Sequence, residues 1–475
     1  MPVARGAMRG GLAALLLSVL MVQPAAAQDR RIPRAQDEIR LSFAPIVRQA
    51  APAVTNIFAK RVVRGEVRSP LLNDPFLKRF FEEGFFGRQL PRERMQNTLG
   101  SGVLVRSDGV IVTNNHVIEN MTEIRVVLSD RREFDAEVIL TDPQTDLAVL
   151  KIDPGDEALP VLQFADSDGV EVGDLVLAIG NPFGVGQTVT SGIVSATSRT
   201  QAGVSDYQFF IQTDAAINPG NSGGALVGVD GRLIGVNTAI FSRSGGSIGI
   251  GFAIPSNMVE RIVESALDDK VVVRPWLGAS GQVVTADIAA SMGLARPIGI
   301  LISQIYPDGP AAKAGLRVGD VLMKIDGWEI YDPQSLRYRI ATGKIGGKAA
   351  VTVWREGSTR ELVVPLLSPP EDPPRNLTLL TGEQPLTGLT IANLSPAFSE
   401  ELGIEGEDRG VIIAKIPPAS PARRLGLRQG DILVKIGDTP IERVSDVVKA
   451  TDTPRKVWEL QIKRGDRIIG MRISA

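Results

Sequence analysis

Cysteine is absent from the 475-residue sequence, and histidine occurs once, as His116. The chain can therefore form no disulfide and carry no lipid on a cysteine, so an exported form must rely on core packing. A zinc site would have almost no ligands to draw on, because histidine and cysteine are the usual ones. We expect neither a metal nor another cofactor.

An excess of one charge is also missing. Lysine and arginine number 52 against 54 aspartate and glutamate, which gives a formal net charge of −2. No basic excess exists to neutralise phosphates, which argues against a nucleic-acid partner. The hydrophobic fraction of 43% and the charged fraction of 22% are typical of a soluble globular protein. At roughly 150 residues per domain, the length corresponds to about three domains.

Long hydrophobic runs are missing too, apart from a short one near the N-terminus. Arg5 and Arg9 precede an apolar core at residues 12–22, and Ala25-Ala26-Ala27 offers a small-residue cleavage site. The apolar core is too short to span a bilayer comfortably. We therefore predict a signal peptide over residues 1–27, export to the periplasm, and no membrane segment in the mature chain. An uncleaved anchor is the alternative.

The most informative stretch that is present is a tight turn between two apolar segments at residues 211–226. It reads Asn218-Pro219-Gly220-Asn221-Ser222-Gly223-Gly224, and its glycines permit positive φ and a close approach of backbone. Successive backbone N–H groups of such a turn can converge on one point. A serine nucleophile requires this, because an anion develops on the attacked carbonyl. An ordinary hairpin turn is the alternative interpretation of Ser222.

A serine nucleophile also needs a base and a carboxylate that orients the base. His116 lies just past a β-branched strand, and histidine is the side chain whose ordinary pKa is near neutrality. Asp146 opens an apolar strand, where aspartate is otherwise a poor choice. Asp142 competes for the same role, and a structural role is the alternative for His116. The chain order His116, Asp146, Ser222 is that of chymotrypsin-type β-barrels.

Three short motifs resemble the catalytic motifs of the HtrA (Do, or Deg) family of serine proteases. They are Thr113-Asn114-Asn115-His116-Val117, Thr145-Asp146-Leu147-Ala148-Val149 and Gly220-Asn221-Ser222-Gly223-Gly224. The resemblance runs from about residue 40 to the end of the chain. It implies a chymotrypsin-like protease domain of two six-stranded β-barrels with the site in the cleft between them.

The resemblance also implies a role for each site residue. Ser222 attacks the carbonyl, His116 moves the proton and Asp146 orients the imidazole. The backbone N–H groups of Gly220 and Ser222, together with Asn221, form the oxyanion hole. The specificity pocket is lined by Ile217, Ile240, Phe241 and Ile250. Because no aspartate lies among these residues, we predict cleavage after small aliphatic residues such as valine and alanine.

The protease domain is predicted over residues 28–270. From residue 98 to about 253 the chain reads as many short strands separated by Gly and Asp turns, which is typical of an all-β barrel or sandwich. Residues 61–97 interrupt the pattern with charges and phenylalanines, and we interpret them as a regulatory loop, with a small docked helix as the alternative. A helix with an apolar stripe begins near Ser256 and closes the domain.

The C-terminal part contains an internal repeat. Residues 299–330 and 410–441 align without gaps and are identical at 15 of 32 positions, which indicates two copies of one domain. The repeated pattern resembles PDZ domains, which bind a chain end as an added β-strand. We predict a first PDZ domain over 271–368, a proline-rich linker over 369–384 and a second PDZ domain over 385–475.

The resemblance to PDZ domains places a carboxylate-binding loop at the start of each copy. These loops are Trp276-Leu277-Gly278-Ala279 and Gly388-Leu389-Thr390. The alternative for the second copy is that it packs against other subunits and binds no peptide. Members of the family assemble from trimers and are activated by peptide at the first PDZ domain, so we expect a homo-oligomer.

The function expected from all of this is that of an ATP-independent serine endopeptidase of periplasmic protein quality control. Its partners would be unfolded or misfolded proteins and their exposed C-termini. Two other functions compete: a chaperone or adaptor that works through its peptide-binding modules, and a site-specific regulatory protease of envelope stress signalling. The cleavable signal and the second PDZ copy favour the general protease.

Overall fold

The computed structural model describes residues 42–63, 94–181, 186–199, 209–218, 220–240, 248–268, 271–404, 406–418, 420–452, 455–465 and 467–474. The chain divides into two units, Met1–Ala44 and Pro45–Ala475, and every strand lies in the second. The signal peptide predicted over 1–27 lies outside the described residues. Among the helices within those ranges, none is long and apolar enough to cross a membrane.

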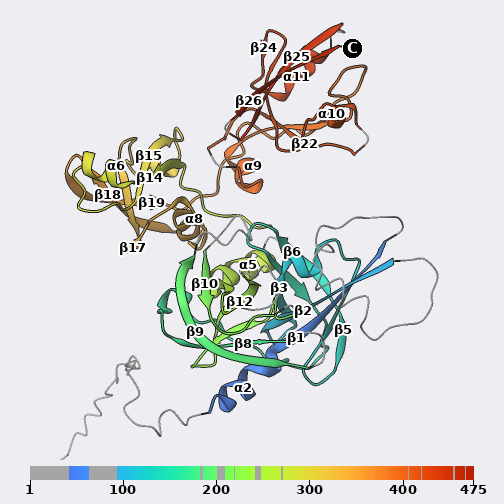
Figure 1. Ribbon diagram of the computed structural model, residues 1–475, viewed down its shortest axis with the longest axis vertical. Helices are drawn as coiled ribbons and strands as arrows, with labels where there is room; N and C mark the ends of the chain where they lie inside the picture. Colours follow the sequence, from blue (N-terminus) through green and yellow to red (C-terminus); the bar gives the residue numbers. More distant parts are fainter. Residues whose placement is uncertain are drawn as a thin grey trace, which may run out of the picture. The chain divides into compact units, whose positions relative to one another are not determined.

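The first sheet contains seven antiparallel strands in the order β5-β4-β1-β2-β3-β7-β6 (Figure 1). Their bounds are β1 Val54–Val63, β2 Arg94–Arg106, β3 Val110–Asn114, β4 Glu123–Val127, β5 Glu133–Asp135, β6 Glu137–Asp142 and β7 Leu147–Lys151. β5 and β6 lie at opposite edges, yet only Ala136 separates them along the chain, so the sheet curls until its edges meet. Counting them as one strand interrupted at Ala136 gives the six strands that were expected.

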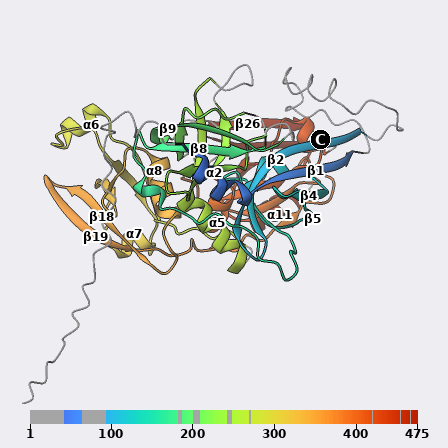
Figure 2. The same ribbon diagram turned by 90° about the horizontal axis from the view of Figure 1, so that it is seen from below.

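The hairpin of β1 and β2 is longer than the sequence suggested. The two strands pair without interruption from Val54 opposite Val103 to Val63 opposite Arg94. Both views show this hairpin projecting beyond the rest of its sheet (Figures 1 and 2). The loop predicted over 61–97 was therefore too long at both ends, because backbone pairing in a hairpin does not require an apolar alternation. The remainder of that loop lies outside the described residues.

The second sheet is a closed barrel of six strands in the order β10-β13-β12-β11-β8-β9, which confirms the expected six-stranded barrel. Its strands are β8 Leu175–Gly180, β9 Thr188–Arg199, β10 Phe210–Thr213, β11 Ala225–Gly228, β12 Leu233–Ile240 and β13 Gly251–Pro255. Alternate residues of these strands, such as Val176, Ala178 and Leu226, fill its interior.

Short helices accompany the two barrels. They are α2 Ala44–Ala50, the 3-10 turn η1 Ala51–Ala53, α4 Asn115–Ile118, η3 Ser167–Gly169 and α5 Ser256–Asp268. α5 confirms the helix predicted after the second barrel. Met258, Val259, Ile262 and Val263 form its buried stripe. The hydroxyl of Ser256, the first helical residue, donates to the carbonyl of Ala165 (2.7 Å).

The internal repeat folds into two sheets of matching element order, each around its own core. The first copy comprises β14 Ala279–Val283, α6 Ala286–Ser291, β15 Ile300–Ile305, α7 Pro310–Lys313, β16 Val321–Ile325, β17 Trp328–Glu329, α8 Pro333–Ala341, β18 Lys348–Arg355 and β19 Ser358–Pro365. The second comprises β20 Thr378–Leu379, β21 Thr390–Asn393, α9 Pro396–Glu401, β22 Val411–Lys415, α10 Pro421–Arg424, β23 Ile432–Ile436, β24 Thr439–Pro440, α11 Val444–Thr451, β25 Val457–Arg464 and β26 Arg467–Ser474.

One ion pair is duplicated with the repeat. In the first copy Arg355 donates to both carboxylate oxygens of Asp320 (2.6 Å each) and to a nearby carbonyl. In the second, Arg464 makes the same bidentate contact with Asp431 (2.6 and 2.7 Å). Hydrogen bonding to the aspartate raises the pKa of each guanidinium, so both arginines stay charged. In each copy this ion pair joins the loop before one strand (β16 or β23) to the neighbouring strand that carries the arginine (β18 or β25).

Arg355→Ala should destabilise the first copy, because it leaves the buried carboxylate of Asp320 without its charged partner, with only the N–H of Arg317 as a donor. Breaking a buried ion pair in this way costs about 3–5 kcal/mol. We expect faster native-state hydrogen exchange in β16 and β18 of the full chain. Arg360→Ala, at an exposed position of β19, is the matched control. Equal exchange rates in the two variants would contradict the prediction.

Candidate active site

The register between β3 and β7 brings His116 and Asp146 together. The run Val110–Asn114 is buried at every position and pairs along β7, with Asn114 opposite Leu147. Residues just past the end of β3 therefore lie beside the residue just before β7. His116, in the single turn of α4, is held there by two contacts: its backbone N–H donates to Asp146 Oδ1 (3.0 Å) and its Nδ1 lies 2.7 Å from Asp146 Oδ2.

Asp146 is arranged to hold one tautomer of the imidazole. Its backbone lies in the left-handed region (φ 59°), which aspartate tolerates better than most residues. Its side chain is only 8% exposed, whereas that of His116 is 42% exposed. A carboxylate only accepts hydrogen bonds, so it holds the proton on Nδ1 and leaves Nε2 of His116 free to take another.

Asp142 is turned to different partners. Its carboxylate forms a buried ion pair with Arg274 and accepts a hydrogen bond from the hydroxyl of Thr145. The geometry therefore favours Asp146, and not Asp142, as the carboxylate that orients His116. The buried guanidinium of Arg274 needs an acceptor, and this explains the aspartate at position 142 without any catalytic role.

Ser222 lies in the turn before β11, among glycines with positive φ at Gly220 (100°) and Gly223 (83°). A Cβ at Gly223 would lie 2.1 Å from the carbonyl oxygen of Ser101, so no other residue fits there. The hydroxyl of Ser222 donates to the carbonyl of Thr238 (3.1 Å). Within the described ranges, no hydrogen bond joins this hydroxyl to the imidazole of His116.

Thr238 contacts two of the three predicted catalytic residues, and no sequence motif pointed to it. Its hydroxyl donates to Asp146 Oδ2 (2.7 Å), while its carbonyl accepts the hydroxyl of Ser222. It is 2% exposed and lies at an irregularity in the pairing of β12 with β13, where Asn237 pairs with Ala253 and Ala239 with Phe252. This bulge lets Thr238 face the first barrel.

The backbone donors of the turn fall into two groups. The N–H groups of Asn221, Gly223 and Gly224 donate to Asn218 (2.9 Å), Asn237 (2.8 Å) and Asn221 (2.9 Å), respectively. Among the described residues, none accepts a hydrogen bond from the N–H of Gly220 or Ser222. Two of the three predicted oxyanion donors are thus available to a ligand, while the N–H of Asn221 is occupied within the turn.

Three of the four predicted specificity residues lie close to Gly251. The side chain of Ile217 is 1% exposed, and a Cβ at Gly251 would lie 2.7 Å from it. Ile240 pairs with Gly251 across β12 and β13, and Ile250 precedes it and is half-buried. Phe241 lies outside the described residues.

The loops predicted to bind chain ends have similar backbones in the two PDZ copies. Gly278 (φ 71°) directly precedes β14, and Gly388 (φ 86°) comes just before β21, with Leu389 buried and Thr390 opening the strand. A cavity is lined by Trp276, Leu277, Gly278 and Ala279 and, from α8, by Leu336 and Ile340, and residues of the second copy between Pro396 and Arg409 complete its lining. A groove between a strand and a helix suits an extended chain end.

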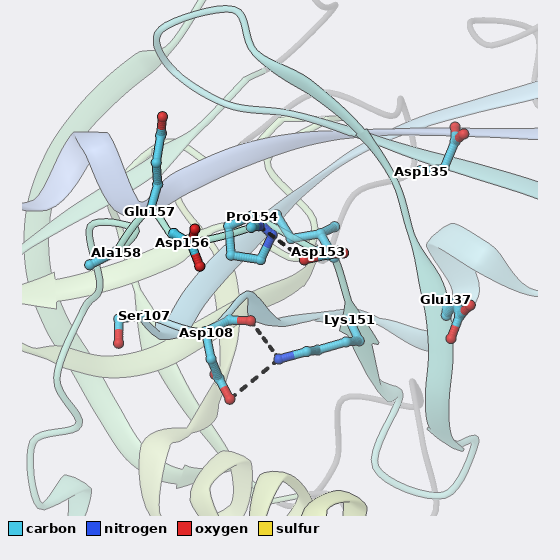
Figure 3. Close-up of a pocket in the computed structure, with 12 residues that line it drawn as sticks. Ser107, Asp108, Asp135, Glu137, Lys151, Asp153, Pro154, Asp156, Glu157 and Ala158 are labelled. Carbon is cyan, nitrogen blue, oxygen red and sulfur yellow. Dashed lines mark hydrogen bonds and ion pairs between the residues drawn. The ribbon is translucent and has the colours of Figure 1, made fainter.

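A second pocket, of about 460 Å³, lies on the first sheet and is lined mainly by carboxylates (Figure 3). Its lysine, Lys151, is bound to the side chain (3.3 Å) and the carbonyl of Asp108. Hydrogen bonding to Arg106, assisted by Lys151, lowers the pKa of Asp108. In the described part of the chain no His, Cys, Asp and Glu cluster could hold a metal ion. The pocket therefore offers negative charge but no metal site.

Comparisons with known proteins agree with this arrangement. A trypsin-like peptidase domain model matches residues 100–236, and PDZ domain models match residues 247–366 and 412–464. Periplasmic serine endoprotease DegP of Salmonella typhimurium is 39% identical over 402 residues, which cover 84% of this chain and 81% of the relative. DegP of Escherichia coli K12 is 36% identical over 453 residues, or 90% and 91% of the two chains.

A solved structure of the HtrA-type protease AlgW with a decapeptide is similar as well. It is 46% identical, with a TM-score of 0.51, and the match covers 70% of this chain and 99% of that one. The match therefore leaves part of the present chain without a counterpart in that structure.

Thr238→Val should weaken peptide hydrolysis, because it removes the hydroxyl that donates to Asp146 while keeping the shape of the side chain. A hydrogen bond to a charged group is worth about 1.5–3 kcal/mol, so we expect kcat on a peptide substrate to fall by about 10- to 150-fold. Thr238→Ser keeps the donor and should retain most of the activity. Indistinguishable kcat values for the valine and serine variants would refute the assignment.

Proposed function

Because the chain belongs to the HtrA-type family of DegP-like serine endopeptidases with PDZ domains, we propose that Ser222 is its nucleophile, His116 its general base and acid, and Asp146 the orienting carboxylate. The observation that carries this proposal is the 2.7 Å contact between His116 Nδ1 and Asp146 Oδ2 at an exposed imidazole. Thr238 supports it by contacting both Asp146 and Ser222.

The reaction proceeds through an acyl-enzyme. The hydroxyl of Ser222 leaves the carbonyl of Thr238 and turns to Nε2 of His116, which takes its proton as Oγ attacks the peptide carbonyl. The imidazolium then protonates the leaving amine, and Asp146 stabilises the positive charge meanwhile. A water molecule, deprotonated by the same imidazole, hydrolyses the ester and frees Ser222.

The oxyanion formed at each step is met by the backbone N–H groups of Gly220 and Ser222. Fixed donors in a site from which water is excluded need not reorganise as the charge develops, and losing one costs about 2.7–4 kcal/mol in the transition state. Asn221 contributes no third donor while its N–H is bonded to Asn218.

The apolar surroundings of Ile217, Ile240 and Ile250, with Phe241, select small aliphatic residues at the cleavage site. Valine and alanine are usually buried in folded proteins, so the substrates are unfolded or misfolded chains. Cleavage maps dominated by lysine and arginine would contradict this specificity, since none of the four predicted pocket residues carries a carboxylate.

The protein works in the periplasm after removal of residues 1–27, in agreement with the location named for its relatives. Peptide C-termini bind in the groove beside Trp276–Ala279 and regulate the protease domain. The subunits assemble as homo-oligomers built from trimers. The second PDZ copy either binds peptide beside Gly388 or joins subunits.

A regulatory protease with a single dedicated substrate is the second candidate. It is supported by the 46% identity to AlgW, whose structure holds a decapeptide. The additional PDZ copy of the present chain, together with full-length matches to DegP, favours the general protease.

The mature protein should degrade casein, and Ser222→Ala should not, since the nucleophile contributes a factor of about 10⁶ to kcat in enzymes of this type. Adding a peptide with an apolar C-terminal residue should accelerate the unmutated protein. If neither protein degrades casein but both suppress its aggregation, the chain acts as a chaperone. If casein is resistant but one membrane signalling protein is cut, the regulatory function holds instead.

Asp146→Asn should lower kcat by about 10⁴-fold, because an amide in place of the carboxylate favours the wrong tautomer of His116. Asp142→Asn should leave kcat within about tenfold when assayed well below its unfolding temperature, although loss of the buried pair with Arg274 destabilises the fold by about 3–5 kcal/mol. Comparable losses of kcat in the two folded variants would show that Asp146 has no special role.

A further inference from the structure

Ser101 is a fully buried residue of β2 that contacts the nucleophile turn through its backbone and its side chain. Its N–H donates to the carbonyl of Ser222 (2.8 Å), and its hydroxyl donates to the carbonyl of Gly220 (2.7 Å). Its own carbonyl abuts Gly223, where a Cβ would come within 2.1 Å. One residue of the first sheet thus touches three positions of a turn that belongs to the second barrel.

The direction of the hydroxyl bond is fixed by its neighbours. The backbone N–H of Asn181 lies 2.9 Å from Ser101 Oγ and can only donate. The single proton of the hydroxyl therefore goes to the carbonyl of Gly220, and a chain of bonds runs from Asn181 through Ser101 to Gly220. The carbonyl of Ser101 is itself held by the hydroxyl of Thr113 (2.7 Å).

These contacts control the orientation of two peptide planes. The carbonyls of Gly220 and Ser222, both bound by Ser101, flank the Asn221–Ser222 peptide, whose N–H is a proposed oxyanion donor. Gly220 has a positive φ of 100° and no side chain to resist rotation. Without the hydroxyl, its buried carbonyl would lose its partner, and the turn could rotate to find another.

We infer that Ser101 is a positioning residue of the oxyanion hole, whose contacts hold the carbonyls of Gly220 and Ser222 and thereby aim the N–H of Ser222 that lies between them. The inference rests on the proposed function of that donor. It assigns to a residue of the first sheet a part in stabilising the transition state, although Ser101 touches neither substrate nor the reacting atoms.

The test uses Ser101→Ala in the full mature protein. We expect kcat on a peptide substrate to fall by about 10- to 100-fold with KM within about threefold, because the lost interaction acts in the transition state. A peptide boronate, which forms a tetrahedral adduct on the serine, should bind more weakly by the same factor as kcat. A product peptide with a free carboxylate, which forms no such adduct, should bind as before.

The matched control is Thr55→Val, which removes a buried hydroxyl from the neighbouring strand β1. Thr55 is 1% exposed, and its hydroxyl has no partner among the described residues, so kcat and boronate affinity should stay unchanged. Should Ser101→Ala fail to accumulate as folded protein, Ser101→Cys replaces it, since a thiol is nearly isosteric but a weak donor and acceptor.

Two results would overturn the inference. One is an unchanged kcat and boronate affinity in the folded Ser101 variant. The other is a parallel loss of boronate and product-peptide affinity, which would indicate general damage to the binding site. Ser222→Ala separates these from failure of the proposed function: if that variant stays active, the nucleophile is wrong, and if it is inactive while Ser101→Ala is unimpaired, only the role of Ser101 fails.

Discussion

The carboxylate of Asp146 accepts hydrogen bonds from both barrels at once. From the first come the N–H and Nδ1 of His116, and from the second comes the hydroxyl of Thr238. Because the carbonyl of Thr238 also accepts the hydroxyl of Ser222, one residue of β12 fixes the carboxylate and holds the proposed nucleophile. The distance between His116 and Ser222 therefore depends on how the two barrels pack against each other.

The packing of the two barrels includes direct backbone contacts. The carbonyl of Ser101 lies so close to Gly223 that any side chain there would collide with it, and the N–H of Ser101 donates to Ser222. Interiors are close-packed and transmit small displacements, so a shift of β2 would move the turn with it. Gly223 is thus required for contact between the barrels as well as for its own positive φ.

The residues proposed for catalysis could be selected from contiguous motifs of the sequence. His116, Asp146 and Ser222 each lie next to a β-branched or apolar strand, and the antiparallel register of β3 and β7 brings His116 beside Asp146. Thr238 and Ser101 could not be found this way, since their partners lie 92 and 119 residues away and depend on a bulge and on barrel seating. The ion pair between Asp320 and Arg355 could not be predicted either, because Arg355 lies beyond the part of the repeat that aligns without gaps.

The hydroxyl of Ser222 is turned from His116 by its hydrogen bond to the carbonyl of Thr238, and this bond is easily exchanged for another. Rotating its hydroxyl from the carbonyl of Thr238 to the imidazole replaces one hydrogen bond with another, a net change of about 0.5–1.5 kcal/mol at most. Such a small difference cannot keep a protease inactive. The Gly220–Asn221 peptide plane is different, because turning it breaks two hydrogen bonds together, one from the hydroxyl of Ser101 and one to the carbonyl of Asn218. Between these two groups, the backbone of the turn, which carries the proposed oxyanion donors, is therefore the one whose rearrangement costs enough to separate two states of the site.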